Sequence, residues 1–192
     1  MPIPERQATN ESRVYTDLFG RNGTPITDFI PKKIHHSPPH FDPEFETFTY
    51  GDPTRNKSRQ LAKLVPEDLL VFYAGLEPIN KMNKPSLYII GYFTVKQVYD
   101  FTKIPREEQN AVLNKLQNNA HTKRTYLDEG LVIVQGNPRN SRLLRLALPL
   151  GDNNDNISSD LKSIIGYSVN IRRAIGHWVY GEHFYKLKEY MK

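Results

Sequence analysis

The sequence predicts an α+β protein built on a mainly antiparallel sheet with flanking helices. Residues 68–74 and 87–95 are apolar, rich in aromatic and β-branched side chains, and separated by a polar turn region, which is typical of an antiparallel hairpin. A third run of this kind covers residues 131–135. Segments with helical spacing lie between and after these runs. We therefore expect the three strands in one sheet.

Five further segments complete the expected secondary structure. Residues 58–64 place leucines three apart before Pro66, which should end a short helix. Residues 105–118 begin with proline and two glutamates and carry an apolar stripe, as helices do. Residues 141–150 fit either a strand or a short helix. The remaining helical signals lie in residues 158–175, mixed with turns, and in the basic tail, 181–192.

Length and composition narrow the class of protein. A chain of 192 residues suits a single domain, and residues 1–13, which are polar and contain prolines, should form a flexible leader. The absence of cysteine excludes disulfides, thiol nucleophiles and zinc–thiolate sites. The sequence shows neither a signal peptide nor an apolar run long enough to span a membrane. We expect a cytoplasmic protein with no membrane partner, and nothing in the sequence predicts an oligomeric state.

The charge favours an anionic partner. The formal net charge of +5 suits nucleic acid or a nucleotide, although a solvated surface rich in lysine would give the same balance. If several of these cations line one groove, binding to an oligonucleotide should weaken steeply with salt. The candidate cations are Arg55, Lys57, Lys123, Arg124, Arg142, Arg145, Arg172 and Arg173.

The segment 32–57 is the expected functional surface, because it has more polar and aromatic residues, and more residues that break helices and strands, than a simple connecting loop needs. Its histidines and carboxylates, with His40, Asp42 and Glu44 foremost, could do acid–base work or hold a divalent metal. A polar loop docked on the core is the alternative. Prolines exclude a helical pair of histidine ligands and no spacing matches a metal motif, so we expect no metal ligand set and no cofactor.

Two later clusters could hold a phosphate or a base. His121, Lys123 and Arg124 precede the strand at 131–135, and a solvated loop is the alternative reading of this cluster. Ser141 and Arg142 follow a Gly-Asn-Pro turn, where free backbone N–H groups could bind an anion. Ser141 could equally be a plain helix N-cap. The chain contains no established catalytic signature such as a phosphate loop.

Several motifs occur in an order that is similar to one family. They are His-x-Asp-Pro-Glu at 40–44, the strands at 68–76 and 88–95, Asn-Ala-His at 119–121, and a segment at 141–150. Their order resembles the third type of nucleotide-modification-associated domain over residues 13–150. Ser141 and Arg142 match a late serine–arginine pair of that family and Pro149 matches its proline, whereas Leu144 replaces its tryptophan. More loosely, the two strands resemble PUA-like domains, including the EVE, ASCH and YTH groups.

The resemblance implies a twisted, partly closed sheet and a nucleic-acid-linked domain from a base-modification or defence system. Such a domain would recognise a modified nucleobase or a nucleotide, with Tyr50 or Tyr73 stacking on the base and Lys123, Arg124 and Arg142 holding phosphate. The alternative is an enzyme that acts on a nucleotide or nucleic acid. Its acid–base or metal set would be drawn from four residues: His40, Asp42, Glu44 and His121.

Overall fold

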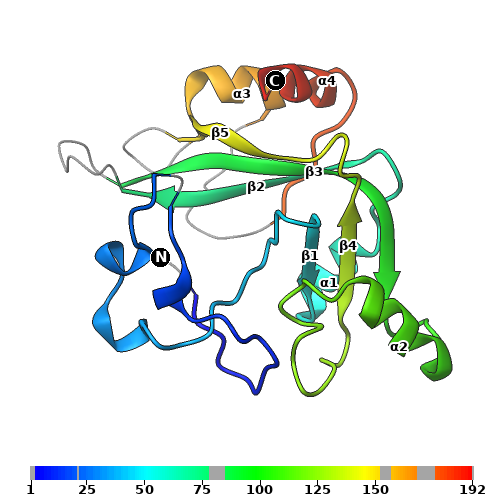
Figure 1. Ribbon diagram of the computed structural model, residues 1–192. Coiled ribbons are helices and arrows are strands. Elements are labelled where there is room, and N and C mark those ends of the chain that lie inside the picture. Colours follow the sequence, from blue (N-terminus) through cyan, green and yellow to red (C-terminus); the bar gives the residue numbers. More distant parts are fainter. Residues whose placement is uncertain (1–2, 21, 78–84, 152–156, 168–175, 192) are drawn as a thin grey trace. The chain divides into compact units, whose positions relative to one another are not determined.

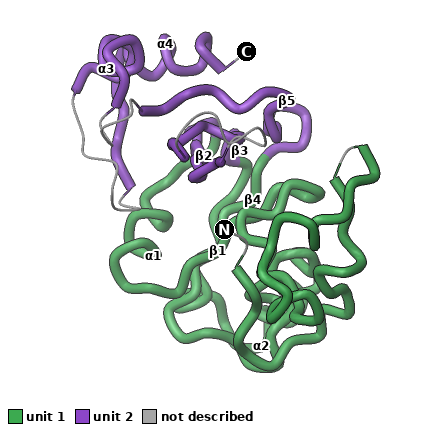
Figure 2. Tube along the Cα trace, turned by 90° about the vertical axis from the view of Figure 1, so that its left-hand side faces the viewer, with its two compact units in different colours: residues 1–66, 96–136 green, residues 67–95, 137–192 purple. Residues whose placement is uncertain are grey.

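The computed structural model describes residues 3–20, 22–77, 85–151, 157–167 and 176–191 (Figure 1). It divides into two compact units, coloured separately in Figure 2. Unit 1 comprises residues 1–66 and 96–136, and unit 2 comprises residues 67–95 and 137–192. The expectation of a single domain stays a prediction. Within the described residues, no helix is both long and apolar enough to cross a membrane.

The expected α+β class and antiparallel pairing are confirmed. The strands are β1 (Thr49–Asp52), β2 (Leu69–Leu76), β3 (Ser86–Asp100), β4 (Val132–Gly136) and β5 (Arg142–Pro149). Their hydrogen-bonded order is β1-β4-β3-β2, with β5 also pairing β3, and the pairs β1–β4, β2–β3 and β3–β5 are antiparallel. The three predicted strands all belong to this sheet. Of the two alternatives for residues 141–150, the strand is correct.

In unit 2, two helices pack on β2, β5 and the first part of β3. They are α3 (Ser159–Ile165) and α4 (Glu182–Tyr190), and they share an apolar cluster with the strands. Serine and glycine delimit α3, because the Ser158 hydroxyl accepts the Leu161 N–H at 3.3 Å and Gly166 ends the helix at φ 85°. A side chain at Gly166 would also collide with the ring of His183.

In unit 1, α2 (Arg106–Lys115) packs against β4 and the end of β3. Pro105 precedes the helix and two glutamates occupy its first turn, as its sequence indicates. The other helix described in this unit, α1 (Arg55–Leu61), begins three residues earlier than predicted; just before it, Asp52 accepts the Thr54 N–H at 2.7 Å. The described part of unit 1 also contains the short 3₁₀ helices η1 (Tyr15–Asp17), η2 (Ile26–Phe29) and η3 (Lys32–Ile34).

Strand β1 lies within the segment 32–57 and was not predicted. Its sequence, Thr-Tyr-Gly-Asp, contains two residues that are depleted in strands. It exists because it pairs with the buried strand β4, with Tyr50 opposite Val134 and Gly51 opposite Ile133. Tertiary pairing therefore outweighs the local preference of these residues.

The described part of the N-terminal segment, residues 3–13, bonds to two distant parts of unit 1. The His40 N–H donates to the Ile3 carbonyl at 2.9 Å, and the Glu5 N–H donates to the Pro38 carbonyl at 2.8 Å. Farther along, the Thr125 N–H donates to the Ala8 carbonyl at 2.9 Å. The segment thus links the chain around His40 to the turn after α2. The expected mobility of residues 1–13 stays a prediction.

Candidate functional site

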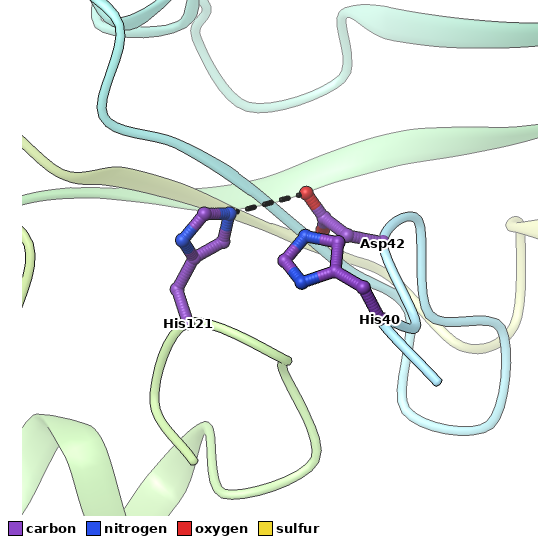
Figure 3. A group of neighbouring side chains, drawn as sticks. All are labelled: His40, Asp42 and His121. Atoms are coloured by element: carbon purple, nitrogen blue, oxygen red, sulfur yellow. Dashed lines mark ion pairs between the residues drawn. The ribbon is translucent and has the colours of Figure 1, made fainter. Parts of the chain in front are cut away.

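Three side chains of unit 1 that are far apart in sequence meet at one point. His40 and Asp42 come from the segment that leads into β1, and His121 comes from the turn after α2 (Figure 3). One nitrogen or oxygen atom from each lies within 4.8 Å of the other two. The side chains of His40, Asp42 and His121 are 14%, 6% and 6% exposed. The structure therefore collects three of the four catalytic candidates in one largely buried centre.

Asp42 is held by one of its two carboxylate oxygens. Its Oδ1 accepts the Gly51 N–H at 3.0 Å and the Asn119 side-chain amide at 3.3 Å. The other oxygen, Oδ2, lies 3.5 Å from Nε2 of His121. The side-chain oxygen of Asn119, Oδ1, also accepts the His121 backbone N–H at 3.0 Å, so one asparagine side chain positions both partners.

Gly51 makes room for the ring of His121. A Cβ atom at this position would lie 3.0 Å from Cδ2 of His121, 3.2 Å from the Asn119 side-chain oxygen and 3.2 Å from the Ile133 side chain. These separations are tighter than ordinary carbon contacts. The glycine in β1 therefore allows the imidazole to lie against the strand while its backbone N–H holds Asp42.

A second layer of charged side chains orients the two histidines. Nδ1 of His40 lies 2.7 Å from Glu5, and Nδ1 of His121 lies 2.7 Å from Asp128. Arg124 joins the two carboxylates, donating from Nε to Glu5 at 3.1 Å and from Nη1 to Asp128 at 2.7 Å. Because each carboxylate accepts from Nδ1–H, the Nε2 atom of each ring is the one left for the centre.

Burial and hydrogen bonding shift the acidity of these groups in opposite directions. Burial raises the pKa of Glu5, but hydrogen bonds from the Gln7 N–H, His40 and Arg124 outweigh it and lower the pKa to about 2. Burial raises the pKa of Asp42, and contacts with His121 and the Gly51 N–H offset only part of that rise. Burial alone would lower the pKa of His121, yet its contacts with Asp42 and Asp128 give a net rise. The Asp42–His121 pair therefore keeps a proton at pH values above the usual pKa range of a carboxyl group.

An open hollow of about 250 Å³ adjoins this centre in unit 1. Its wall is formed by Ile3, Pro4, Glu5, Arg6, Gln7, His40 and Arg124. Ligand sites for drug-sized molecules usually enclose about 300–1,000 Å³, so this hollow suits a smaller group such as a single nucleobase. Of the three central residues, His40 is the one that lines it.

The fourth catalytic candidate, Glu44, has a different role. Its carboxylate accepts the Thr47 N–H at 2.9 Å and the Thr49 hydroxyl at 3.4 Å, which closes the turn that leads into β1. Two cations predicted to hold phosphate are also engaged within the fold. Lys123 pairs with Glu11 at 2.6 Å, and Arg124 pairs with the two carboxylates of the second layer.

The remaining candidates are divided between the units. In unit 1, Tyr50 of β1 is half-buried, and burial together with Asp42 and Asp52 raises its pKa. In unit 2, Tyr73 packs against the apolar cluster, and Arg142 is exposed on β5. Ser141 is buried, and its hydroxyl accepts the Thr94 N–H at 3.1 Å. It precedes a strand, so its reading as a helix N-cap is wrong.

Two predicted cations, Arg172 and Arg173, lie outside the described residues. Four residues that complete the site were not predicted from the sequence: Glu5, Gly51, Asn119 and Asp128. Asn119 belongs to the Asn-Ala-His motif, so its sequence neighbourhood was a usable signal. The partner of Glu5, Arg124, is separated from it by 119 residues, and no local pattern connects them.

Comparison with known proteins supports the family resemblance. The family model described as nucleotide modification associated domain 3 matches residues 1–187, which is nearly the whole chain. No curated protein and no solved structure matches the chain. The looser likeness to PUA-like domains therefore stays an expectation. Because the family model covers both units, the chain belongs to the nucleotide modification associated domain 3 family.

Proposed function

We propose that this chain is an enzyme that acts on a nucleotide, or on a base within a nucleic acid, and that His40, Asp42 and His121 form its reacting centre. Membership of a family associated with nucleotide modification supports the substrate class. The observation that carries the enzymatic part is the meeting of three proton-exchanging groups within 4.8 Å. Buried groups of this kind are expensive to maintain and gather at sites of chemistry.

The arrangement suits proton transfer to or from a bound base. Of the three central residues, His40 lines the hollow, so its imidazole is the one of the three that a bound base would contact. Next to it, Oδ2 of Asp42 and Nε2 of His121 lie 3.5 Å apart as an ion pair in which either partner can carry the proton. The edge of a nucleobase offers ring nitrogens and exocyclic oxygens or amines, which are the groups that such a set protonates or deprotonates.

Recognition without reaction is the second candidate, and the hollow itself favours it. Arg6 and Gln7 line the wall, and a guanidinium and an amide are suited to hydrogen bonding with base edges. Against this candidate, Lys123 and Arg124 are engaged in ion pairs, which leaves them less able to hold phosphate. In addition, recognition of a neutral base does not require carboxylates such as Glu5 and Asp128 to orient the two histidines.

The test is a search for chemical change in nucleotides. The full-length protein is incubated with nucleotides and with oligonucleotides carrying ordinary or modified bases, and the nucleosides are then analysed by mass spectrometry. Wild type should change the mass of at least one nucleoside, and Asp42→Asn should not. His36→Ala is the matched control for His40→Ala, because His36 is an exposed histidine of the same segment.

The outcomes separate the two candidates. Binding that His40→Ala abolishes, without any change of mass, would replace the enzyme with a recognition domain. The proposal would fail if wild type neither bound nor altered any nucleotide or oligonucleotide.

A further inference from the structure

The contacts of His40, Asp42 and His121 leave one atom of each facing the others. Both Nδ1 atoms bind carboxylates, and Oδ1 of Asp42 binds the Gly51 N–H. The remaining atoms are the two Nε2 atoms and Oδ2 of Asp42. Figure 3 shows a ring nitrogen of each histidine turned towards the Asp42 carboxylate. Two imidazole nitrogens and one carboxylate oxygen thus converge, as ligands around a metal ion do.

The second layer supports this interpretation independently. Histidines that bind metals almost always donate their other ring N–H to a carboxylate, a carbonyl or water, and this bond fixes the direction of the ligating nitrogen. Here both histidines have such a carboxylate at 2.7 Å, Glu5 for His40 and Asp128 for His121. Arg124 then connects the two carboxylates. A histidine that only fills space needs neither arrangement.

The distances are compatible with an ion after a small contraction. Metal–nitrogen and metal–oxygen distances of about 2.0–2.1 Å place neighbouring ligand atoms roughly 3.0–3.4 Å apart. The Asp42 and His121 atoms are separated by 3.5 Å, which is already close to that range. The three ligand atoms lie within 4.8 Å of one another, so His40 needs to approach by about 1–2 Å at most.

The donor set selects the class of ion. Imidazole favours zinc, iron, copper and nickel, whereas magnesium and calcium favour sites made of oxygen ligands. Three protein ligands also leave positions open, which distinguishes catalytic sites from closed structural ones. Water or a polar atom of a substrate would fill such an open position.

We propose that His40, Asp42 and His121 bind one divalent transition-metal ion of the zinc or iron kind, with Glu5 and Asp128 positioning the histidines. This inference builds on the proposed function, because the ion would occupy the same reacting centre. It replaces the expectation from the sequence that the chain has no metal ligand set. Sequence spacing could not indicate it, because the third ligand follows 79 positions after Asp42 on a different turn.

Metal binding is tested on the full-length protein without any nucleotide. The protein is treated with a chelator, dialysed, and titrated separately with Zn²⁺, with Mg²⁺ and, under anaerobic conditions, with Fe²⁺. Calorimetry gives the affinity, and elemental analysis after gel filtration gives the number of ions per chain. Wild type should hold one Zn²⁺ or Fe²⁺ ion per chain and bind Mg²⁺ far more weakly. Co²⁺ should give the visible absorption of a protein-bound ion.

Matched variants identify the ligands. Loss of an outer partner typically weakens metal affinity 10–100-fold, so Glu5→Gln should fall in about that range and His40→Ala or Asp42→Ala beyond it. His36→Ala should bind as wild type does. Circular dichroism and urea unfolding check that each variant is folded, and the isosteric variant Asp42→Asn replaces Asp42→Ala if the latter is not.

The result distinguishes this inference from the proposed function. The metal site would be overturned if wild type held clearly less than one Zn²⁺ or Fe²⁺ ion per chain. It would also be overturned if wild type and folded His40→Ala bound the ion with equal affinity. Nucleotide conversion that persists in chelator would then leave the proposed function standing. One bound ion per chain without any conversion or binding of nucleotides would support the metal site and contradict the proposed function.

Discussion

Arg124 is the residue whose removal should most clearly expose the energetics of the site. Its guanidinium contacts Glu5 and Asp128, and the side chains of these three residues are 10%, 3% and 12% exposed. Removing one member of a buried ion pair costs about 3–5 kcal/mol, because a charge is left without a partner. The hollow beside Glu5 admits water, so we discount this figure and expect Arg124→Ala to cost about 2–4 kcal/mol.

Urea unfolding measures this cost directly. With a slope of about 2 kcal/mol per molar urea, the midpoint should fall by roughly 1–2 M in Arg124→Ala. Arg6→Ala is the control, because Arg6 lines the same hollow but is exposed, and it should change stability by less than about 0.5 kcal/mol. Arg124→Lys should recover only part of the loss, since an ammonium does not have the planar fork that reaches both carboxylates. A loss below about 1 kcal/mol, or an equal loss in Arg6→Ala, would show that Arg124 does not balance the charges of Glu5 and Asp128 in the folded protein.

Three further predictions concern acid stability and close packing. Burial raises the pKa of Glu11, but its contacts with Arg13 and Lys123 outweigh burial and lower the pKa from 4.5 to about 2. A carboxyl group with a lowered pKa stabilises the folded state above pH 4.5, where it is charged in both the folded and the unfolded chain. The stability advantage of wild type over Glu11→Gln should therefore shrink as the pH falls from about 4.5 to 2. Gly51→Ala should cost about 1–3 kcal/mol in urea unfolding through contact with His121 and weaken ligand binding. Ser141→Ala should cost about 1–3 kcal/mol, because the buried Thr94 N–H loses its acceptor, and should leave nucleotide binding unchanged.

Each of these predictions has a contrary outcome. A constant difference between wild type and Glu11→Gln across the acid range would show that the carboxylate is not held in its charged form. A stable Gly51→Ala with normal binding would mean that the ring of His121 moves freely. A stable Ser141→Ala that has lost nucleotide binding would restore the anion-binding role that the sequence suggested for this residue.

The long strands were predictable because their apolar pattern records burial in the sheet. Strand β1 was not, because Gly51 and Asp52 weaken its strand pattern and its pairing with β4 is a tertiary effect. The sequence grouped His40, Asp42 and Glu44 as candidates on chain proximity alone, and the structure brings His40 and Asp42, but not Glu44, together with His121. The side chain of Glu44 instead serves its own turn.

The second layer of the site could not be predicted, since it depends on contacts between distant segments. Glu5 lies in a segment whose polar, proline-containing sequence is typical of a flexible leader, yet its carboxylate reaches His40 and Arg124. The phosphate-binding role expected for Lys123 and Arg124 followed from their charge. Charge in a sequence does not show whether a carboxylate of the same fold, such as Glu11, already occupies the cation.

His40, Asp42 and His121 should act as one unit on a nucleotide. The most direct test compares nucleoside conversion by wild type, His40→Ala, Asp42→Asn and the double variant, all confirmed as folded. Groups that act together lose most of their effect at the first substitution, so the double variant should be no slower than the slower single variant. Losses that multiply in the double variant, or conversion equal to that of wild type in either single variant, would contradict a shared centre.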